Sequence, residues 1–182
     1  MAVRQLLETL VPQHWDSQKP GAPSGFNRVR WLQGLNDLIS RPVNNRGVIT
    51  LPATIVNLNG GLQSTGQGIT PLQPKRYAEF TVKARVTFQL NGAGAGYIHV
   101  MRTLGSIPAN GAAPNAGDVI VGGDAFAGGQ LTGGVNQAGA FSFLDTGLDI
   151  TKSYRYYLAV KGTAAQQLSL ANTSQLLVME RS

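Results

Sequence analysis

The chain has 182 residues, 42% of them hydrophobic, which is enough for one domain with a core of its own. Only 13% are charged, against about 25% in typical soluble domains, while glycine is abundant at 23 residues. This composition favours a β protein with a polar, uncharged surface and disfavours a helical bundle. The absence of cysteine excludes disulfides and thiolate metal sites.

The net charge of +6 is concentrated in the N-terminal half. Residues 1–90 hold ten Lys/Arg and four Asp/Glu, whereas residues 91–182 hold five of each. A basic half can contact nucleic acid, an anionic surface or an acidic protein. Because the basic residues form no consecutive run, we expect docking to a protein rather than to nucleic acid.

The sequence also predicts where the protein is made. No stretch approaches the ~20 apolar residues of a membrane span. The segment MAVRQLLETLVPQHW carries Glu8 among its apolar residues and lacks a small-residue cleavage site. We therefore expect synthesis in a cytosol, no signal peptide and no membrane partner.

Residues 1–47 show helical spacing and are predicted to form an arm. One apolar stripe runs from Val3 to Val11 and is ended by Pro12, and a second runs from Val29 to Ile39 and is ended by Pro42. Helices of this length are marginal alone, below ~12–15 residues, so they must rest on another surface. That surface can be the chain's own domain or a neighbouring protein.

From Val48 onward the apolar period changes to two, which predicts a β domain over residues 48–182. The clearest strand is YAEFTVKARVTFQL, with one apolar and one polar face. NGAGAG then predicts a turn, and YIHVMRTL is predicted to be the hairpin partner of that strand. Residues 105–139 are Gly/Ala/Asn-rich and predict long loops around one or two short strands.

Four further strands are predicted near the C-terminus, in AFSFLD, SYRYYLAV, QLSLA and QLLVME. In the second of these, Tyr154, Tyr156 and Leu158 share a face opposite Arg155 and Tyr157. About eight strands without helical interruption indicate a mainly β fold, an antiparallel jelly-roll sandwich.

The octet FLDTGLDI, residues 143–150, matches the catalytic turn of retroviral-type aspartic proteases. Such a domain needs a flap hairpin and a bracing apolar-apolar-Gly segment after the motif. Only 35 residues follow Gly147, and their single glycine, Gly162, is not preceded by an apolar pair. We therefore predict a turn between strands, in which the Asp145 carboxylate caps backbone N–H groups.

Other candidate chemistry is equally weak. NGAGAG is followed by a strand rather than by the helix that a phosphate loop requires. His14 and His99 are isolated, and no acidic or histidine cluster has metal-ligand spacing. Asn172 begins a formal glycosylation sequon that is predicted to be a turn. We predict no catalytic residue, no cofactor and no metal site, and hence a protein that is not an enzyme.

A family resemblance lies in FSFLDTGLDITKSYRYYLAVKGTAAQQLSLANTSQLLVMER and in YAEFTVKARVTFQLNGAGAGYIHVMR. Their succession of strands and turns resembles TNF/C1q-like jelly-roll modules of tailed-bacteriophage virion proteins. The resemblance covers residues 77–182, and the Pro expected in the Asp-containing turn is absent. It implies a homotrimer packed through apolar and aromatic sheet faces. The residues of this trimer or core face are Phe80, Val82, Val86, Phe88, Tyr154, Tyr156 and Leu158.

The sequence and the resemblance together predict a virion structural protein, made in the host cytoplasm, that acts as a capsid decoration (cement) or head-fibre protein. Its arm is expected to bind the major capsid protein or another virion protein. The predicted contact residues are Leu6, Leu7, Leu10, Trp15, Arg28, Arg30, Trp31 and Leu35. One alternative is a tail-fibre tip that binds a host receptor or glycan through residues 105–139 and exposed tyrosines. Another is a small jelly-roll capsid subunit that packages nucleic acid, against which the modest, interleaved charge argues.

Overall fold

A computed structural model describes residues 43–75, 78–91, 96–128 and 136–181 of the chain. All eight predicted arm contacts, from Leu6 to Leu35, lie outside the described residues, as do most of NGAGAG and the two predicted helices. The described part begins directly with a strand at Val43, five residues before the predicted domain boundary at Val48.

The described residues form ten strands and no helix. The strands are β1 (Val43–Thr50), β2 (Thr54–Asn57), β3 (Gln63–Gly68), β4 (Phe80–Asn91), β5 (Gly96–Thr103), β6 (Val119–Gly128), β7 (Asn136–Asp145), β8 (Arg155–Gly162), β9 (Gln167–Leu170) and β10 (Gln175–Arg181). A search of these residues for a helix with the length and hydropathy needed to cross a bilayer finds none.

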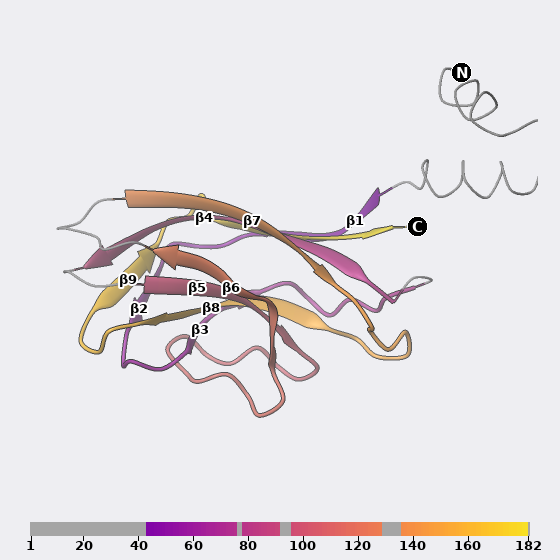
Figure 1. Cartoon of the computed structure of the whole chain (residues 1–182), viewed down its shortest axis with the longest axis horizontal. Helices are drawn as coiled ribbons and strands as arrows, with labels where there is room; N and C mark the ends of the chain where they lie inside the picture. Colours follow the sequence, from indigo (N-terminus) through magenta and orange to yellow (C-terminus); the bar gives the residue numbers. More distant parts are fainter. Residues whose placement is uncertain (1–42, 76–77, 92–95, 129–135, 182) are drawn as a thin grey trace, which may run out of the picture. The chain divides into compact units, whose positions relative to one another are not determined.

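The strands form two antiparallel sheets that pack as the layers of a sandwich (Figure 1). In sheet A, β1 pairs with β10 and β2 pairs with β9. Both β10 and β9 pair with one side of β4, and β7 pairs with the other side of β4. Sheet A therefore has four strand positions, in the order β1/β2, β10/β9, β4, β7. Sheet B has the order β3, β8, β5, β6. Two four-position sheets connected in this order form an eight-stranded jelly roll, which confirms the predicted fold class.

The break between β9 and β10 is made by a short turn. Thr87 N donates to Ser174 Oγ (3.0 Å), and Ala171 N donates to Thr87 O (2.8 Å), so β4 keeps its bonding across the interruption. Asn172 lies in this turn, as predicted.

The core lies between the two sheets and takes side chains from both. In β4 buried and partly or fully exposed residues alternate along all 12 residues, from Phe80 to Asn91. Phe80 meets Tyr156 of sheet B edge to face, with ring centroids 6.0 Å apart. Every residue of the predicted trimer or core face is buried within this single chain, and the most exposed of them is Tyr154 at 6%.

Two local predictions are wrong. β4 and β5 are not a hairpin, because β4 lies in sheet A and β5 in sheet B. An alternating strand followed by a Gly-rich turn is compatible with either arrangement, since local pattern sets the inward face but not the pairing partner. Residues 105–139 also contain more strand than predicted, because β6 has ten residues and β7 begins at Asn136.

The strand content of this region depends on tertiary pairing rather than on local preference. Gly and Ala have low β-propensity, but β5 pairs with six residues of β6 and β4 pairs with all ten residues of β7. Gly122 is required where β6 passes β7, because a Cβ there would lie 1.8 Å from the Phe143 ring.

Candidate interaction surface

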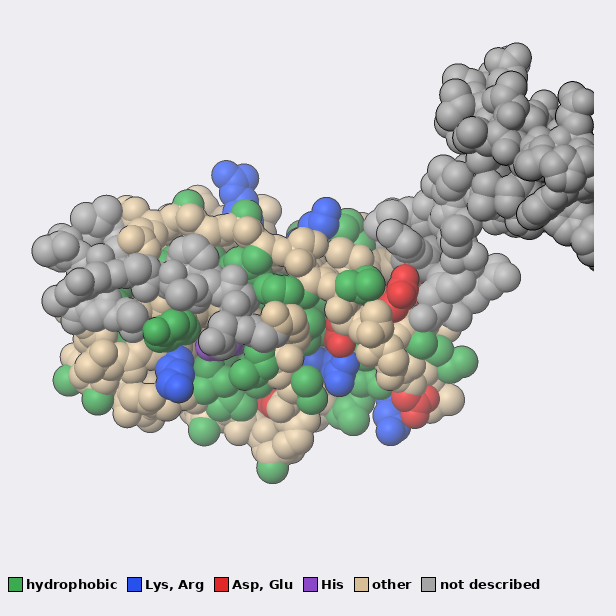
Figure 2. Space-filling model, in the orientation of Figure 1, with side chains coloured by type: hydrophobic (Ala, Val, Ile, Leu, Met, Phe, Trp, Pro, Cys, Tyr) green, Lys and Arg blue, Asp and Glu red, His purple; other side chains and the backbone are tan. Residues whose placement is uncertain are grey.

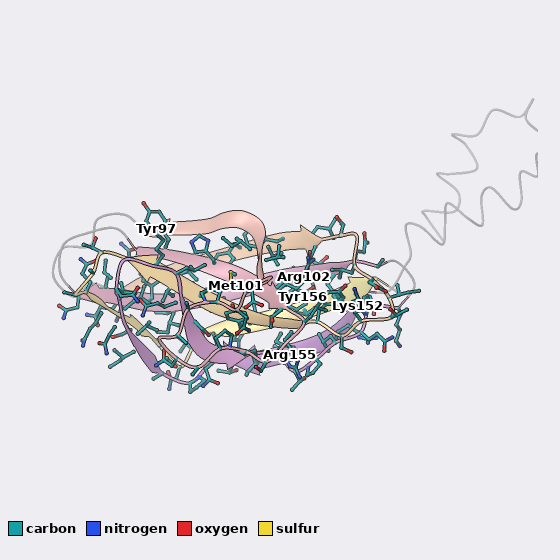
Figure 3. The ribbon with its side chains drawn as sticks, turned by 90° about the horizontal axis from the view of Figure 1, so that it is seen from below. Tyr97, Met101, Arg102, Lys152, Arg155 and Tyr156 are labelled. Atoms are coloured by element: carbon teal, nitrogen blue, oxygen red, sulfur yellow. The ribbon has the colours of Figure 1, made fainter. Side chains whose placement is uncertain are left out.

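Asp145, at the end of β7, is held by two side chains from sheet B. It is 8% exposed, and its carboxylate accepts from Arg102 Nη1 (2.5 Å) and from Tyr156 Oη (2.7 Å). Figure 3 shows Arg102 beside Tyr156, whereas Tyr97 projects away at the other end of β5. The Arg102 guanidinium also lies 5.4 Å from the centroid of the Tyr154 ring. Burial, and then the Asp145 charge, raise the pKa of Tyr156, which keeps this phenol protonated as a donor.

This arrangement joins the two sheets and does not resemble a catalytic turn. Both Asp145 oxygens are bound by side chains, so the prediction that this carboxylate caps backbone N–H groups is wrong. An aspartic protease places two carboxylates together so that they share a proton, whereas Asp145 faces a cation and a phenol. No group of three His, Cys, Asp or Glu residues that could hold a metal ion occurs in the described part of the chain.

The turn-forming carboxylate belongs to Asp149. It accepts from Thr151 N (2.9 Å) and from Thr151 Oγ1 (2.7 Å). The hydrogen bonds from Thr151 hold the pKa of Asp149 below its usual value. The octet therefore contains a capping aspartate, but it is the second of the two.

The outer face of sheet B is covered by the chain itself. Met101, Tyr157 and Ala159 point away from the main core, and residues 104–118 pass over them with Ile107 packed against them. This loop then reaches the free edge of β3, where Ser64 N donates to Ala112 O (2.7 Å) and Gly111 N donates to Ser64 O (2.9 Å). Tyr157 Oη donates to the Asp118 carboxylate at 2.7 Å.

The tyrosines on which the glycan-binding alternative depended are buried, Tyr154 and Tyr156 in the core between the sheets and Tyr157 under the covering loop. Tyr156 and Tyr157 are fully buried and Tyr154 is nearly so. These three residues therefore cannot supply the exposed tyrosines of the glycan-binding alternative, and the burial of Tyr154 and Tyr156 agrees with their placement on the trimer or core face. Sequence reasoning placed Tyr157 opposite Tyr156 correctly but had no means of detecting a cover over that second face.

The outer face of sheet A has no such cover among the described residues. It carries two cross-strand rows, one formed by Val48, Leu177, Lys83 and Ser142, and the other by Thr50, Gln175, Arg85 and Ala140. Leu177 is half-buried and the others are exposed. Ala140 and Ser142 are small beside the long side chains of β4, which leaves a hollow of about 410 Å³ lined by residues of β4, β7 and β10. Basic side chains project above the layer of β4 and β7 (Figure 2).

This face is positively charged. The described strands of sheet A contain two acidic residues, Asp145 and Glu180, and both are buried. Asp145 is paired with Arg102, and Glu180 is paired with Arg46 at 3.1 Å. Lys83 and Arg85 form no ion pair with any described residue, so they present their charge to solvent beside apolar Val48 and Leu177. Such a surface can bind an acidic, partly apolar partner.

Comparison with known proteins finds no matching family model and no matching curated protein. Among solved structures, a chain in a structure of infectious bursal disease virus, Gx strain, is 13% identical with a TM-score of 0.45, and the match covers 78% of this chain and 34% of that chain. A chain in a structure of the Gt strain is 12% identical with a TM-score of 0.41, covering 78% of this chain and 33% of that chain. The chain spans about a third of the length of these two chains.

Proposed function

We propose that this protein is a non-enzymatic structural component of a virus particle, of the capsid decoration or head-fibre type. The observation that carries the proposal is the contrast between interior and surface. Internal hydrogen bonds occupy the polar groups of Asp145, Tyr156 and Tyr157. By contrast, Lys83 and Arg85 on the outer face of sheet A are exposed and can contact a partner. The protein then acts by adhesion rather than by chemistry.

The arm supplies the apolar part of this adhesion. Leu6, Leu7 and Leu10 form its first stripe, and Trp15, Trp31 and Leu35 extend the apolar surface. Burying one such side chain contributes roughly 1.5–3 kcal/mol, so burying all six helps to offset the free-energy cost of association. Arg28 and Arg30, together with the basic face of sheet A, favour an acidic landing surface on a major capsid protein or another virion protein.

Attachment is tested by changing the apolar stripe in the full chain. We expect Leu6→Ser, Leu7→Ser and Leu10→Ser together to abolish incorporation into particles, measured by co-sedimentation of the protein with them. Ile150→Ser is the matched control, because Ile150 is 50% exposed on the β domain and is not part of the arm. Unchanged incorporation of the triple variant would contradict an attachment role. A deletion should end at Pro42, since removing residues 43–47 would take away part of β1.

The non-enzymatic part is tested at Asp145. Asp145→Asn should lower the free energy of unfolding by about 3 kcal/mol, because it leaves the Arg102 charge without its buried partner. Asp149→Asn is the control, since it changes the same residue type in an exposed turn. Peptide cleavage by the native protein that disappears in a folded Asp145→Asn variant would overturn the proposal.

A further inference from the structure

β7 differs from the other three exposed edges of the sandwich. The β1/β2 edge is broken by an irregularity between Asn45 and Gly47 and by Pro52. The β3 edge is bonded to Gly111 and Ala112. The register of β6 on β5 shifts between Ile98 and Val100. By contrast, β7 pairs with β4 over ten consecutive residue pairs without any shift, and no described strand lies on its other side.

The hydrogen bonds of β4 show which backbone groups of β7 have no partner among the described residues. Thr87 directs its N–H and C=O groups toward residues 171–174, and therefore away from β7. Because successive residues of a strand point these groups to opposite sides, Val86 directs its groups toward β7, where Gly139 lies opposite. On β7 the groups that point away from β4 are then those of Asn136, Ala138, Ala140, Ser142 and Leu144. No backbone bond joins the last four of these to another described residue outside β4.

β7 also lacks the features that normally protect such an edge. Natural edge strands are blocked by charged side chains, Pro, bulges or short length. The sequence NQAGAFSFL has no charge and no Pro, and each of its residues is exposed or half-buried. A long, regular, uncharged and open edge is a template for another strand.

We propose that a second copy of this chain occupies this edge, with β7 pairing antiparallel to β7 about a twofold axis near Phe141. In this register Ala138 lies opposite Leu144 of the other copy, and Ala140 lies opposite Ser142. These four residues of each copy then form about eight backbone hydrogen bonds. Leu144, which is 58% exposed, is matched with a small partner, and the half-buried Phe141 and Phe143 lose further contact with water.

Charge distinguishes this edge pairing from a face-to-face contact between copies. Stacking two outer faces of sheet A would bring Lys83 and Arg85 of both copies together. In the edge pairing, Arg85 of one copy and Lys83 of the other share a row but are separated by three strand spacings, about 14 Å. That separation exceeds the Debye length of about 8 Å at physiological ionic strength, so the repulsion is largely screened. Because residues 136–144 of β7 are uncharged, pairing β7 with β7 of a second copy causes no charge repulsion between the two strands, which favours a second copy as the occupant.

The decisive experiment uses Ala140→Pro in the full chain, with mass measured by sedimentation or light scattering. Proline removes an N–H that points to the second copy and none that bonds to β4, so the domain keeps its own ladder. We expect the mass of the native assembly to fall by half. Thr50→Pro is the matched control, because Thr50 lies on the opposite edge of sheet A and points its N–H away from β10; its mass should equal that of the native protein. A native protein that is monomeric, or an assembly whose mass is unchanged by Ala140→Pro, would overturn the proposal.

The register is tested by cysteine cross-linking, which is simple because the chain has no cysteine. Hydrogen-bonded antiparallel pairs have Cα atoms about 5.5 Å apart, within disulfide range. An oxidised mixture of Ala140→Cys and Ser142→Cys proteins should therefore form the covalent dimer faster than either protein alone. Equal rates in the mixture and the separate proteins would contradict this register. The inference does not rest on the proposed function, since both readouts are independent of any particle.

Discussion

In both sheets alternate side chains point outward, but the outer face of sheet B is buried whereas the outer face of sheet A is exposed among the described residues. On sheet B, Met101 and Tyr157 point outward and yet are buried, because residues 104–118 fold over them. On sheet A, Lys83 and Arg85 also point outward and remain exposed. The direction of a side chain in a strand therefore does not decide whether it meets water; the presence of a covering segment does.

The two faces also differ in what they can do. The covered face stabilises the fold through apolar contact and the hydrogen bond from Tyr157 to Asp118. The open face carries Lys83 and Arg85, which form no ion pair with a described residue, beside exposed Val48 and half-buried Leu177. Under the proposed function, this face binds an acidic partner. Matched substitutions on the two faces should separate these roles.

The largest expected difference is between Tyr157→Ala and Arg85→Ala. Tyr157 is fully buried, so its truncation should lower the free energy of unfolding by about 4 kcal/mol. Arg85→Ala should change it by less than about 0.5 kcal/mol. Urea denaturation monitored by circular dichroism gives both values. Comparable losses in the free energy of unfolding for the two variants would show that the two outer faces contribute equally to stability.

Tyr157→Phe should have the next largest effect and a distinctive pH dependence. Loss of the bond to the Asp118 carboxylate should cost about 2 kcal/mol at neutral pH. Burial, and then the bond to Asp118, raise the pKa of Tyr157 above its ordinary value of 10.0. The stabilisation is therefore complete below pH 10 and is lost as the pH rises further, because the unfolded chain ionises first. The advantage of the native protein over Tyr157→Phe in the free energy of unfolding should therefore shrink above pH 10.

A smaller difference is expected for serine removal. Ser64 Oγ is buried, donates to Pro108 O (2.9 Å) and accepts from Gly66 N (2.9 Å), so it helps to fasten the covering loop. Ser64→Ala should lower the free energy of unfolding by about 1 kcal/mol. Ser142→Ala, on the open face, should leave it unchanged. Hydrogen exchange would locate the effect, with faster exchange expected at Ala112 in the first variant only.

The smallest effect on stability is expected from Lys83→Ser combined with Arg85→Ser. Surface changes of this kind alter the free energy of unfolding by at most about 0.5 kcal/mol. Under the proposed function, the same variant should bind particles more weakly and with a reduced dependence on salt, since two charges no longer contribute. Full binding at low salt would show that the basic face is not the docking surface.

Much of the β domain was accessible from local pattern. The alternation from Phe80 to Leu90 predicted the buried face of β4, and the pattern of residues 154–160 predicted that of β8. The same alternation also predicted the outward-facing residues of β4, which include Lys83 and Arg85. Period-two alternation reports which side of a strand is apolar, and a sandwich buries that side.

The pairing of strands and the fate of Asp145 were not accessible in this way. β4 and β5 were expected side by side and lie in different sheets. Asp145 was expected to cap its own turn, but its carboxylate binds Arg102 and Tyr156. These residues lie 43 and 11 positions away in the chain, so no local sequence pattern predicts the contacts. Asp149, only two residues from its partner Thr151, is the member of the octet whose role follows from short-range geometry.

By itself, then, the sequence determined a mainly β domain with about eight strand positions, the apolar face of its clearest strands, and a turn after residue 145. Only the tertiary structure decided which sheet each strand joins, that residues 104–118 bury Tyr157, and that no described strand pairs with the second edge of β7. The physical reason is one of range. Side-chain alternation and turn preference depend on residues that are neighbours in the chain. The order of strands in a sheet, the covering of a sheet face by a loop and the exposure of an edge depend on contacts between residues far apart in sequence, which no local pattern predicts.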